Sequence, residues 1–363
     1  MQSGWLREQQ NQSEQAGDGQ SEEQGGGVSR RGFLQGGVVA GVAAGVVAGG
    51  ALAMHHQQAH AQTAGNPFGK TWWPSPWGPT DEAGASNRIT PARVLEATRL
   101  IKTGRIFPLG RVVESGIPVF GARHVSITIP GGPTGGPFGE NRMMYNDEMF
   151  SGEIGQVATQ FDGLGHIGTL VGNETVYYNG LKQSEVGGAY GLQKLGVQNV
   201  KPFFTRGILV DVLALKGGDR LPIGYVITPQ DIQAALQSQG IKEPGEGDVV
   251  VFRTGHGKLW MKDNAEYNKG CPGIGATAAK WLIDRKIAMV GGDTWPVEAV
   301  PGENKDKPFE CHQWLITMNG IYIHENLDVE ALAAARVHEF AYVFSPIRIK
   351  GGTGSPGNPI AVA

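Results

Sequence analysis

The densest group of polar side chains in the chain lies in the segment QVATQFDGLGH, residues 156–166. Gln156, Gln160 and Asp162 stand at even spacings, so their side chains share one face if the segment is extended. His166 follows after two glycines, which would let backbone approach a site closely. A carboxylate and an imidazole this close can bind a divalent metal or act as ligand and base. The segment alone also fits a structural role, with Asp162 capping a turn and His166 bonding a backbone carbonyl.

A second polar group lies in CHQWLITMNGIYIHENLD, residues 311–328, which contains His312 and Glu325. Glu325 follows the apolar run Ile-Tyr-Ile after one histidine. A carboxylate buried by such a run is costly unless a cation or metal compensates it. The alternative is that Glu325 caps the helix expected to start near Asp328.

Two further candidates follow the ends of expected strands. Asp293 and Trp295 lie in VGGDTWP, and His256 lies in FRTGH. Ligands of open α/β folds bind at the carboxyl ends of strands. Trp295, together with Phe161 of the first group, could wall an apolar pocket. His256 fits an ordinary loop histidine equally well.

The elements that must position these residues alternate between helices and strands. The pairs Thr90-Pro91 and Thr228-Pro229 indicate helix starts, and glycines 104 and 240 indicate the ends of those helices. Further helices are expected at 275–285 and 329–337, and strands at 124–130, 206–215, 248–253, 287–290 and 340–349. Residues 130–139 and 351–359 are expected to be loops because of their glycine and proline content. The pattern predicts a single α/β domain.

The first 61 residues are expected to lie outside this domain. A polar leader precedes Arg30-Arg31, an uncharged Gly/Ala/Val run spans 36–53, and Ala59-His60-Ala61 fits a cleavage site. This pattern resembles a twin-arginine (Tat) export signal. We therefore expect residues 1–61 to be the signal and leader, and 62–363 to be a periplasmic catalytic domain that meets the membrane only during export. The alternative is an uncleaved N-terminal anchor.

Composition narrows the class of partner. Hydrophobic residues make up 40% of the 363 residues, enough for a sizeable core, and the formal net charge is -3. No block of basic residues is present, so a nucleic-acid partner is not expected. We expect a small-molecule substrate and a homo-oligomer. Cys271 and Cys311 have no evident base partner for nucleophilic chemistry, and the sequence leaves open whether they pair.

Several segments of the sequence resemble those of a known family and occur in the same order along the chain. Between about residue 150 and 361 the chain resembles the putative cyclase family, which includes bacterial kynurenine formamidases and isatin hydrolases. The resemblance implies a swivelling β/β/α-type fold and a site for Zn or Mn. The segments that carry it are TQFDGLGH, RGILVDV, GDVVVFRTGH, AAKWLIDRKIAMVGGDTWPVE, HQWLITMNGIYIHENLD and PIRIKGGTGSPGNPIA.

This chain departs from the site motif of that family, H-x-G-T-H-x-D-x-P-x-H. Gln156 and Gln160 stand where the motif has its first two histidines. Asp162 and His166 match it, and two smaller departures are Ala158 for Gly and Leu164 for Pro. A Gln carbonyl oxygen is a harder and weaker ligand than imidazole, so Mn is favoured over Zn. The site could hold one ion, two or none.

The resemblance implies a role for each residue. The expected metal ligands are Gln160, Asp162, His312 and Glu325, and the expected general base is His166. The residues expected to bind substrate are Gln156, Phe161, His256, Asp293 and Trp295.

The expected activity is metal-dependent hydrolysis of a cyclic amide, a lactone or a small acyl amide, with water activated by the metal. The alternatives are a lyase, dehydratase or cyclase on the same scaffold, or an inactive periplasmic binding protein.

Overall fold

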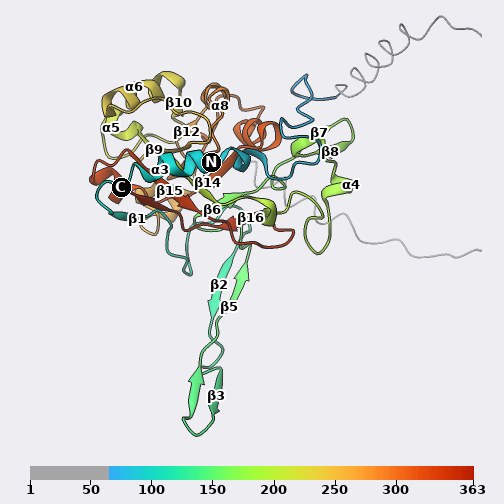
Figure 1. Ribbon diagram of the computed structural model, residues 1–363, viewed down its shortest axis with the longest axis vertical. Coiled ribbons are helices and arrows are strands. Elements are labelled where there is room, and N and C mark those ends of the chain that lie inside the picture. The colour runs from blue at the N-terminus through green and yellow to red at the C-terminus, as the bar shows by residue number, and fades with distance from the viewer. Residues whose placement is uncertain (1–64) are drawn as a thin grey trace, which may run out of the picture. The chain divides into compact units, whose positions relative to one another are not determined.

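A nine-stranded mixed sheet forms the centre of the molecule in the computed structural model, which describes residues 65–363 (Figure 1). The expected export signal at 1–61 lies outside the described residues. Within 65–363 we find no helix of the length and apolarity needed to span a bilayer. In order across the sheet, the strands are β1 (Ile106–Pro108), β17 (Ile360–Val362), β15 (Glu339–Phe344), β9 (Phe203–Asp211), β11 (Val249–Arg253), β13 (Met289–Gly292), β14 (Tyr322–Glu325), β6 (Gln160–Asp162) and β16 (Gly354–Pro356).

The middle of the sheet is parallel and its flanks are antiparallel. Strands β9, β11, β13 and β14 run parallel to one another, and β15 and β6 pair antiparallel on either side. Residues 249–252 of β11 are buried without interruption. Such continuous apolar runs are typical of parallel strands covered on both faces. This confirms the expected α/β class.

Helices cover the sheet, and four of the eight α-helices, α3, α6, α8 and α10, begin within one residue of a start that the sequence predicts. Thr90 and Thr228 accept hydrogen bonds from the backbone N–H of Arg93 and Asp231, and Gly240 ends its helix in the left-handed region. Figure 1 shows α5, α6 and α8 gathered above the sheet. The helices are α3 (Pro91–Thr98), α4 (Gln183–Val186), α5 (Val212–Lys216), α6 (Pro229–Gln239), α7 (Asn264–Tyr267), α8 (Ala276–Asp284), α9 (Glu310–His312) and α10 (Glu330–Ala334). Short 3₁₀ turns are η1 (Gly84–Arg88), η2 (Tyr178–Gly180), η3 (Val197–Asn199) and η4 (His256–Leu259), and η5 (Gln313–Thr317) is a π-helix.

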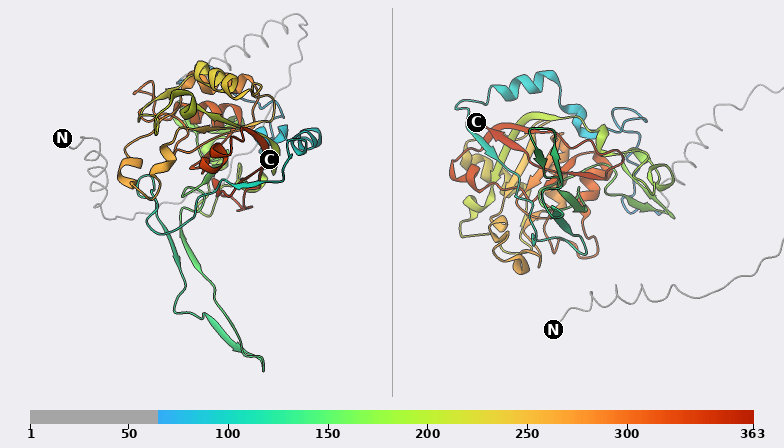
Figure 2. Two further views of the ribbon diagram at one scale, coloured as in Figure 1. Left: turned by 90° about the vertical axis from the view of Figure 1, so that its left-hand side faces the viewer. Right: turned by 90° about the horizontal axis from the view of Figure 1, so that it is seen from below.

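A long hairpin leaves the body of the molecule, and we call residues 124–153 the arm (Figures 1 and 2). Its inner part pairs β2 (Val125–Thr128) with β5 (Met149–Gly152), and its outer part pairs β3 (Gly135–Phe138) with β4 (Met143–Tyr145). Smaller ladders join β7 (Thr169–Val171) to β8 (Glu174–Val176) and β10 (Val226–Ile227) to β12 (Gly273–Ile274).

Several expected boundaries were wrong for local reasons. Residues 212–215 form helix α5 rather than the end of a strand, because the Asp211 carboxylate caps the N–H of Ala214 at 2.9 Å. The expected loops at 130–139 and 351–359 contribute strands β3 and β16. The expected strand at 340–349 ends at Phe344. A local cap accounts for α5, and pairing with another strand outweighs composition in β3 and β16.

Candidate metal centre and substrate pocket

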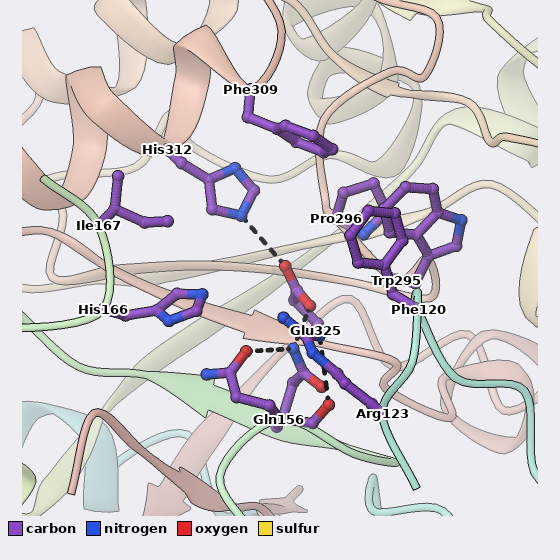
Figure 3. Close-up of a pocket in the computed structure, with 11 residues that line it drawn as sticks. Phe120, Arg123, Gln156, His166, Ile167, Trp295, Pro296, Phe309, His312 and Glu325 are labelled. Carbon is purple, nitrogen blue, oxygen red and sulfur yellow. Dashed lines mark hydrogen bonds and ion pairs between the residues drawn. The ribbon is translucent and has the colours of Figure 1, made fainter. Parts of the chain in front are cut away.

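Antiparallel pairing of β6 with β14 brings the two distant polar groups together. Gln160 lies opposite Glu325, and Asp162 lies opposite Ile323. Ligand atoms of Asp162, His312 and Glu325 all lie within 4.8 Å of one another, and all three residues are buried. The structure therefore places three of the four expected metal ligands around one point, and Figure 3 shows two of them, His312 and Glu325.

His312 enters the cluster from the junction of α9 and the π-helix η5. Its Nε2 lies 3.2 Å from Glu325 Oε1 and 3.8 Å from Asp162 Oδ2. Its Nδ1 is hydrogen-bonded to Glu298, which also accepts the backbone N–H of Cys311 at 3.2 Å and of His312 at 3.1 Å. A carboxylate behind a histidine fixes the ring orientation and the nitrogen that is free to bind. Glu298 is thus a positioning residue for His312.

The two glutamines donate hydrogen bonds to the carboxylates of the cluster. Gln156 Nε2 lies 3.1 Å from Asp162 Oδ1, and Gln160 Nε2 lies 2.6 Å from Glu325 Oε2. In this arrangement the amide nitrogen of Gln160 faces Glu325, whereas the expected ligand role needs its carbonyl oxygen. Because an amide can rotate by half a turn, the geometry assigns Gln160 a donor role in this state and a ligand role only after rotation.

The cluster contains more acidic side chains than basic ones. Burial and the neighbouring Asp162 raise the pKa of Glu325 to about 8. Burial disfavours a charged His312, but hydrogen bonds to Glu298 and Glu325 outweigh burial and raise its pKa well above the ordinary value. Asp162 Oδ2 is buried without a hydrogen-bond partner. Two carboxylates, an imidazole and an orphaned acceptor oxygen suit a divalent cation, so the residues present fit a metal.

His166 lies beside the cluster and is partly exposed to the pocket. Its Nε2 is 3.9 Å from Asp162 Oδ1. Burial lowers the pKa of His166 and outweighs the opposite effect of Asp162. The imidazole is therefore neutral at neutral pH and can accept a proton.

The cluster opens into a pocket of about 200 Å³. Figure 3 shows His166 and His312 on one side of Glu325, Phe120 and Trp295 on the other, and Phe309 above it, beside His312. The rings of Phe120 and Trp295 stack at 4.8 Å, and Phe309 packs against Trp295 at 6.1 Å. The pocket thus offers an apolar aromatic wall opposite its polar cluster. The other lining residues are Arg123, Gln156, Gln160, Ile167 and Pro296.

Not every residue expected at the pocket lies there. Phe161 is fully buried on the opposite face of β6, against Phe203, Tyr322 and Phe344. Successive residues of a strand point to opposite faces, so Gln160 and Asp162 cannot share their face with the residue between them. Its expected place in the pocket wall was wrong.

His256 and Asp293 also lie outside the pocket lining. His256 is buried, and its Nε2 lies 3.1 Å from the Tyr267 carbonyl oxygen. Asp293 accepts bonds from the backbone N–H groups of Thr254 and Gly255 and from the Thr254 hydroxyl at 2.6 Å. Asp293 thereby links the end of β13 to the end of β11. His256 and Asp293 both bind groups of the protein itself and so have structural roles. Of the residues expected to bind substrate, Gln156 and Trp295 line the pocket.

The sequence did not indicate a role in the site for four residues: Phe120, Arg123, Glu298 and Phe309. Glu298 stands in WPVEAV, where nothing in the local pattern distinguishes it from a surface acid. Phe120 and Arg123 precede the arm, in a segment without helical or strand periodicity. Only two features of the sequence could have pointed to Glu298: it follows the end of a strand, and it lies close to His312 along the chain.

The comparisons with known proteins agree with this fold. The family model described as "Putative cyclase" matches residues 107–299, more than half of the chain. A crystal structure of a protein described as a novel cyclase superposes with a TM-score of 0.70 at 34% sequence identity, covering 79% of this chain and 96% of that one. A search of curated proteins gives no significant match.

Two isatin hydrolase structures show the same fold at lower identity. Isatin hydrolase A from Labrenzia aggregata, bound to benzyl benzoate, has a TM-score of 0.52 at 21% identity and covers 71% of this chain and 93% of its own. An isatin hydrolase bound to the product analogue thioisatinate has a TM-score of 0.52 at 19% identity and covers 75% of this chain and 95% of its own. The family model matches more than half of this chain, and the novel cyclase is 34% identical to it over about four-fifths of its length. This chain therefore belongs to the putative cyclase family.

Proposed function

We propose that this protein is a metal-dependent hydrolase that opens a cyclic amide, a lactone or a small acyl amide. The observation that carries the proposal is the meeting of Asp162, His312 and Glu325 beside His166 at the polar end of an aromatic-walled pocket. Family membership supports an enzyme of this kind, and similar folds among isatin hydrolases support a small cyclic substrate.

Asp162, His312 and Glu325 would hold a divalent cation. Bound there, the cation would polarise a carbonyl group and make nearby water more acidic. Two carboxylates with one imidazole form an oxygen-rich set, which favours Mn²⁺ over Zn²⁺. Glu298 keeps the His312 ring in the orientation that turns its Nε2 toward the carboxylates.

His166 supplies the proton transfers. Its neutral imidazole takes a proton from water as the water oxygen bonds to the carbonyl carbon. It then returns that proton to the leaving nitrogen or oxygen as the bond from carbon to that atom breaks. The lowered pKa of His166 keeps it in the accepting form at neutral pH.

The aromatic wall would hold the substrate ring. Phe120 and Trp295 face the cluster across the pocket and Phe309 packs beside His312, so a flat apolar substrate would place its carbonyl toward Glu325 and His312. Arg123 lines the same pocket, and its guanidinium donates a hydrogen bond to the backbone carbonyl oxygen of Gln156 at 3.3 Å. Its guanidinium would offset the carboxylate that hydrolysis produces.

The test is hydrolysis of a panel of lactams, lactones and formamides by purified protein, before and after chelation and after return of Mn²⁺. We expect activity to disappear on chelation and to return with metal. His166→Gln should lower kcat by roughly 10²–10⁴-fold, whereas His124→Gln, which changes an exposed histidine, should not. Activity that survives exhaustive chelation contradicts the metal role. Release of water rather than its consumption indicates a lyase, and ligand-induced melting shifts without turnover indicate a binding protein.

We also propose export to the periplasm by the twin-arginine route. Support comes from Arg30-Arg31, the uncharged run and Ala59-His60-Ala61. Replacing both arginines by lysine should leave the protein in the cytoplasm of a Tat-competent host. Periplasmic recovery of that variant equal to the wild type would contradict this route.

A further inference from the structure

A second cavity lies beside β1, at one edge of the central sheet (Figure 1), and we call it the edge cavity. Its volume is about 330 Å³, enough for a small organic molecule. Its lining comes from the segment after α3 (100–105), the end of α6 (239–241), the connection from α10 to β15 (336–339) and Ala363. None of its lining residues is shared with the pocket of the metal cluster. The edge cavity is therefore a separate candidate binding site.

Basic side chains outnumber acidic ones in the edge cavity. Lys102, Arg105 and Arg336 line it, against one acidic side chain, Glu339. Glu339 already forms an ion pair of 2.6 Å with Arg206. Among residues 65–363, no carboxylate lies within 4.0 Å of the charged nitrogens of Lys102, Arg105 or Arg336. Three positive charges therefore meet at this cavity without an acidic partner in the described chain.

Arg336 stands at a backbone position that glycine usually occupies. It follows Ala335, the C-cap of α10, and lies in the left-handed region with a φ of 54°. Glycine is preferred at such a position because an L side chain there costs free energy. Residues held in this region are more frequent at ligand sites than elsewhere. The geometry of the helix end therefore does not select an arginine here, whereas a ligand of the cavity would.

The wall of the edge cavity satisfies its own backbone acceptor with donors other than the Arg105 guanidinium. The carbonyl oxygen of Ala363 accepts the backbone N–H groups of Thr103 at 3.1 Å and Arg105 at 3.2 Å, and the Thr103 hydroxyl at 2.8 Å. The guanidinium itself lies over the ring of Phe107, 4.8 Å from the ring centroid. A ring face restrains a guanidinium without using its N–H donors, so these donors are left for a ligand.

Apolar side chains and a neutral histidine complete the edge cavity. Leu100, Ile241 and Val337 line it and are half-buried. Burial lowers the pKa of His338, so at neutral pH its imidazole adds an N–H donor to the wall rather than a charge. The cavity thus combines unpaired cations with an apolar wall, and a matching ligand needs a negative charge and an apolar part.

We propose that the edge cavity binds a small organic anion, a molecule with a carboxylate group on an apolar body. Lys102, Arg105 and Arg336 would bind the carboxylate, since guanidinium N–H groups match the two oxygens of a carboxylate. Leu100 and Ile241 would contact the apolar body. Inorganic phosphate would meet the cations but bury no apolar surface. A nucleic acid is disfavoured because the chain has a net charge of -3 and no block of basic residues.

Calorimetric titration of the full-length chain with benzoate tests the proposal. We expect saturable binding that Arg105→Gln/Arg336→Gln weakens by roughly tenfold or more. Arg105→Lys/Arg336→Lys keeps both charges and should retain part of the affinity, which separates loss of charge from damage to the fold. The matched control Arg348→Gln/Lys350→Gln removes two exposed cations outside the cavity lining and should bind benzoate as the wild type does.

Further titrations separate the edge cavity from the pocket of the metal cluster and from unselective anion binding. Arg123→Gln removes the arginine of that pocket and should leave benzoate binding at the edge cavity intact. Benzyl alcohol has the ring without the charge and should not bind there. Inorganic phosphate should bind at least about tenfold more weakly than benzoate.

Four outcomes would overturn the proposal. The first is a wild type without saturable benzoate binding, and the second is unchanged affinity in Arg105→Gln/Arg336→Gln or equal loss in Arg348→Gln/Lys350→Gln. The third is loss of all benzoate binding in Arg123→Gln, which would assign the anion to the pocket of the metal cluster. The fourth is a phosphate affinity equal to that for benzoate, which would contradict the contact with an apolar body.

Discussion

Gln160 and Glu325 lie directly opposite each other on the antiparallel strands β6 and β14, and the Gln160 amide donates a 2.6 Å hydrogen bond to Glu325 Oε2. The bond stabilises the charged carboxylate but provides no strong metal ligand. Gln156 does the same for Asp162 at 3.1 Å. The motif that the sequence resembles has histidines at both positions, and here both side chains donate hydrogen bonds to carboxylates of the cluster.

Restoring the imidazoles should change the preferred metal. In Gln156→His/Gln160→His we expect Zn²⁺ affinity to rise by roughly tenfold or more, because imidazole suits Zn²⁺ better than a carboxamide does. Competition with a chromophoric chelator measures the affinity. Gln237→His, on the exposed side of α6, is the control for adding an imidazole elsewhere. Equal Zn²⁺ affinity in wild type and double variant would show that these two positions do not face the ion.

Metal binding should release protons and strengthen with pH. Burial raises the pKa of Glu325 to about 8, so this carboxyl is mostly protonated at pH 6 and a metal must displace the proton. Because the pKa of His312 is raised as well, the ion displaces protons from two ligands, and its apparent affinity should increase by at least about tenfold per pH unit between pH 6 and 8. Calorimetry in two buffers of different ionisation enthalpy counts the protons, and we expect at least one per ion. An affinity independent of pH in this window would contradict the assignment.

Removing the carboxylate behind His312 should weaken metal binding without removing a ligand. Glu298→Gln keeps the shape of the side chain but loses the charge that orients the ring. We expect metal affinity to fall by roughly 10–100-fold. Glu114→Gln, which neutralises an exposed acid, should leave affinity unchanged. If Glu298→Asp recovers part of the lost affinity, orientation by a carboxylate is the cause, whereas equal loss in both variants would indicate damage to the fold.

His256 should make the folded protein sensitive to acid. Burial lowers its pKa to about 4, so the unfolded chain, with an ordinary pKa near 6.5, binds a proton at a higher pH than the folded chain does. Its stabilising contribution is present above pH 6.5 and is lost as the pH falls toward 4. Between pH 7 and 5 the loss is about 2 kcal/mol.

Urea unfolding at both pH values measures this effect. In His256→Gln the decrease in the free energy of unfolding should be smaller than in wild type by about that amount. His124→Gln, at an exposed position, should behave as wild type. A wild-type pH dependence in His256→Gln would assign the acid sensitivity to other groups.

Much of the fold could be predicted from short-range signals. The Thr-Pro starts of α3 and α6, the left-handed Gly240 and the apolar run of β11 each have a local physical cause that the sequence displays. Strand β16 could not be predicted, because its residues pair with the distant strand β6. Strand β3 pairs with the neighbouring β4, and its glycines and prolines favoured a loop by composition.

The candidate site could be predicted only where a local pattern in the sequence displays it. Even spacing predicted that Gln156, Gln160 and Asp162 share one face of an extended segment. Strand β6 bears this out for Gln160 and Asp162 and excludes Phe161, whereas Gln156 reaches the cluster from a bend before the strand. The meeting with His312 depends on the pairing of β6 with β14, which no local pattern reveals. Glu298 acts only through its contact with His312, so its role emerges only from the three-dimensional arrangement.

The three-residue strand β6 constrains how this site can diversify. Its outer residues serve the cavity while the middle residue fills the core, so inserting or deleting one residue there would turn an aromatic ring into the cavity and bury a carboxylate in the hydrophobic interior. Changes of side chain at fixed length avoid that penalty. Relatives with this scaffold are therefore expected to differ at these positions by point replacement and to accept length changes elsewhere.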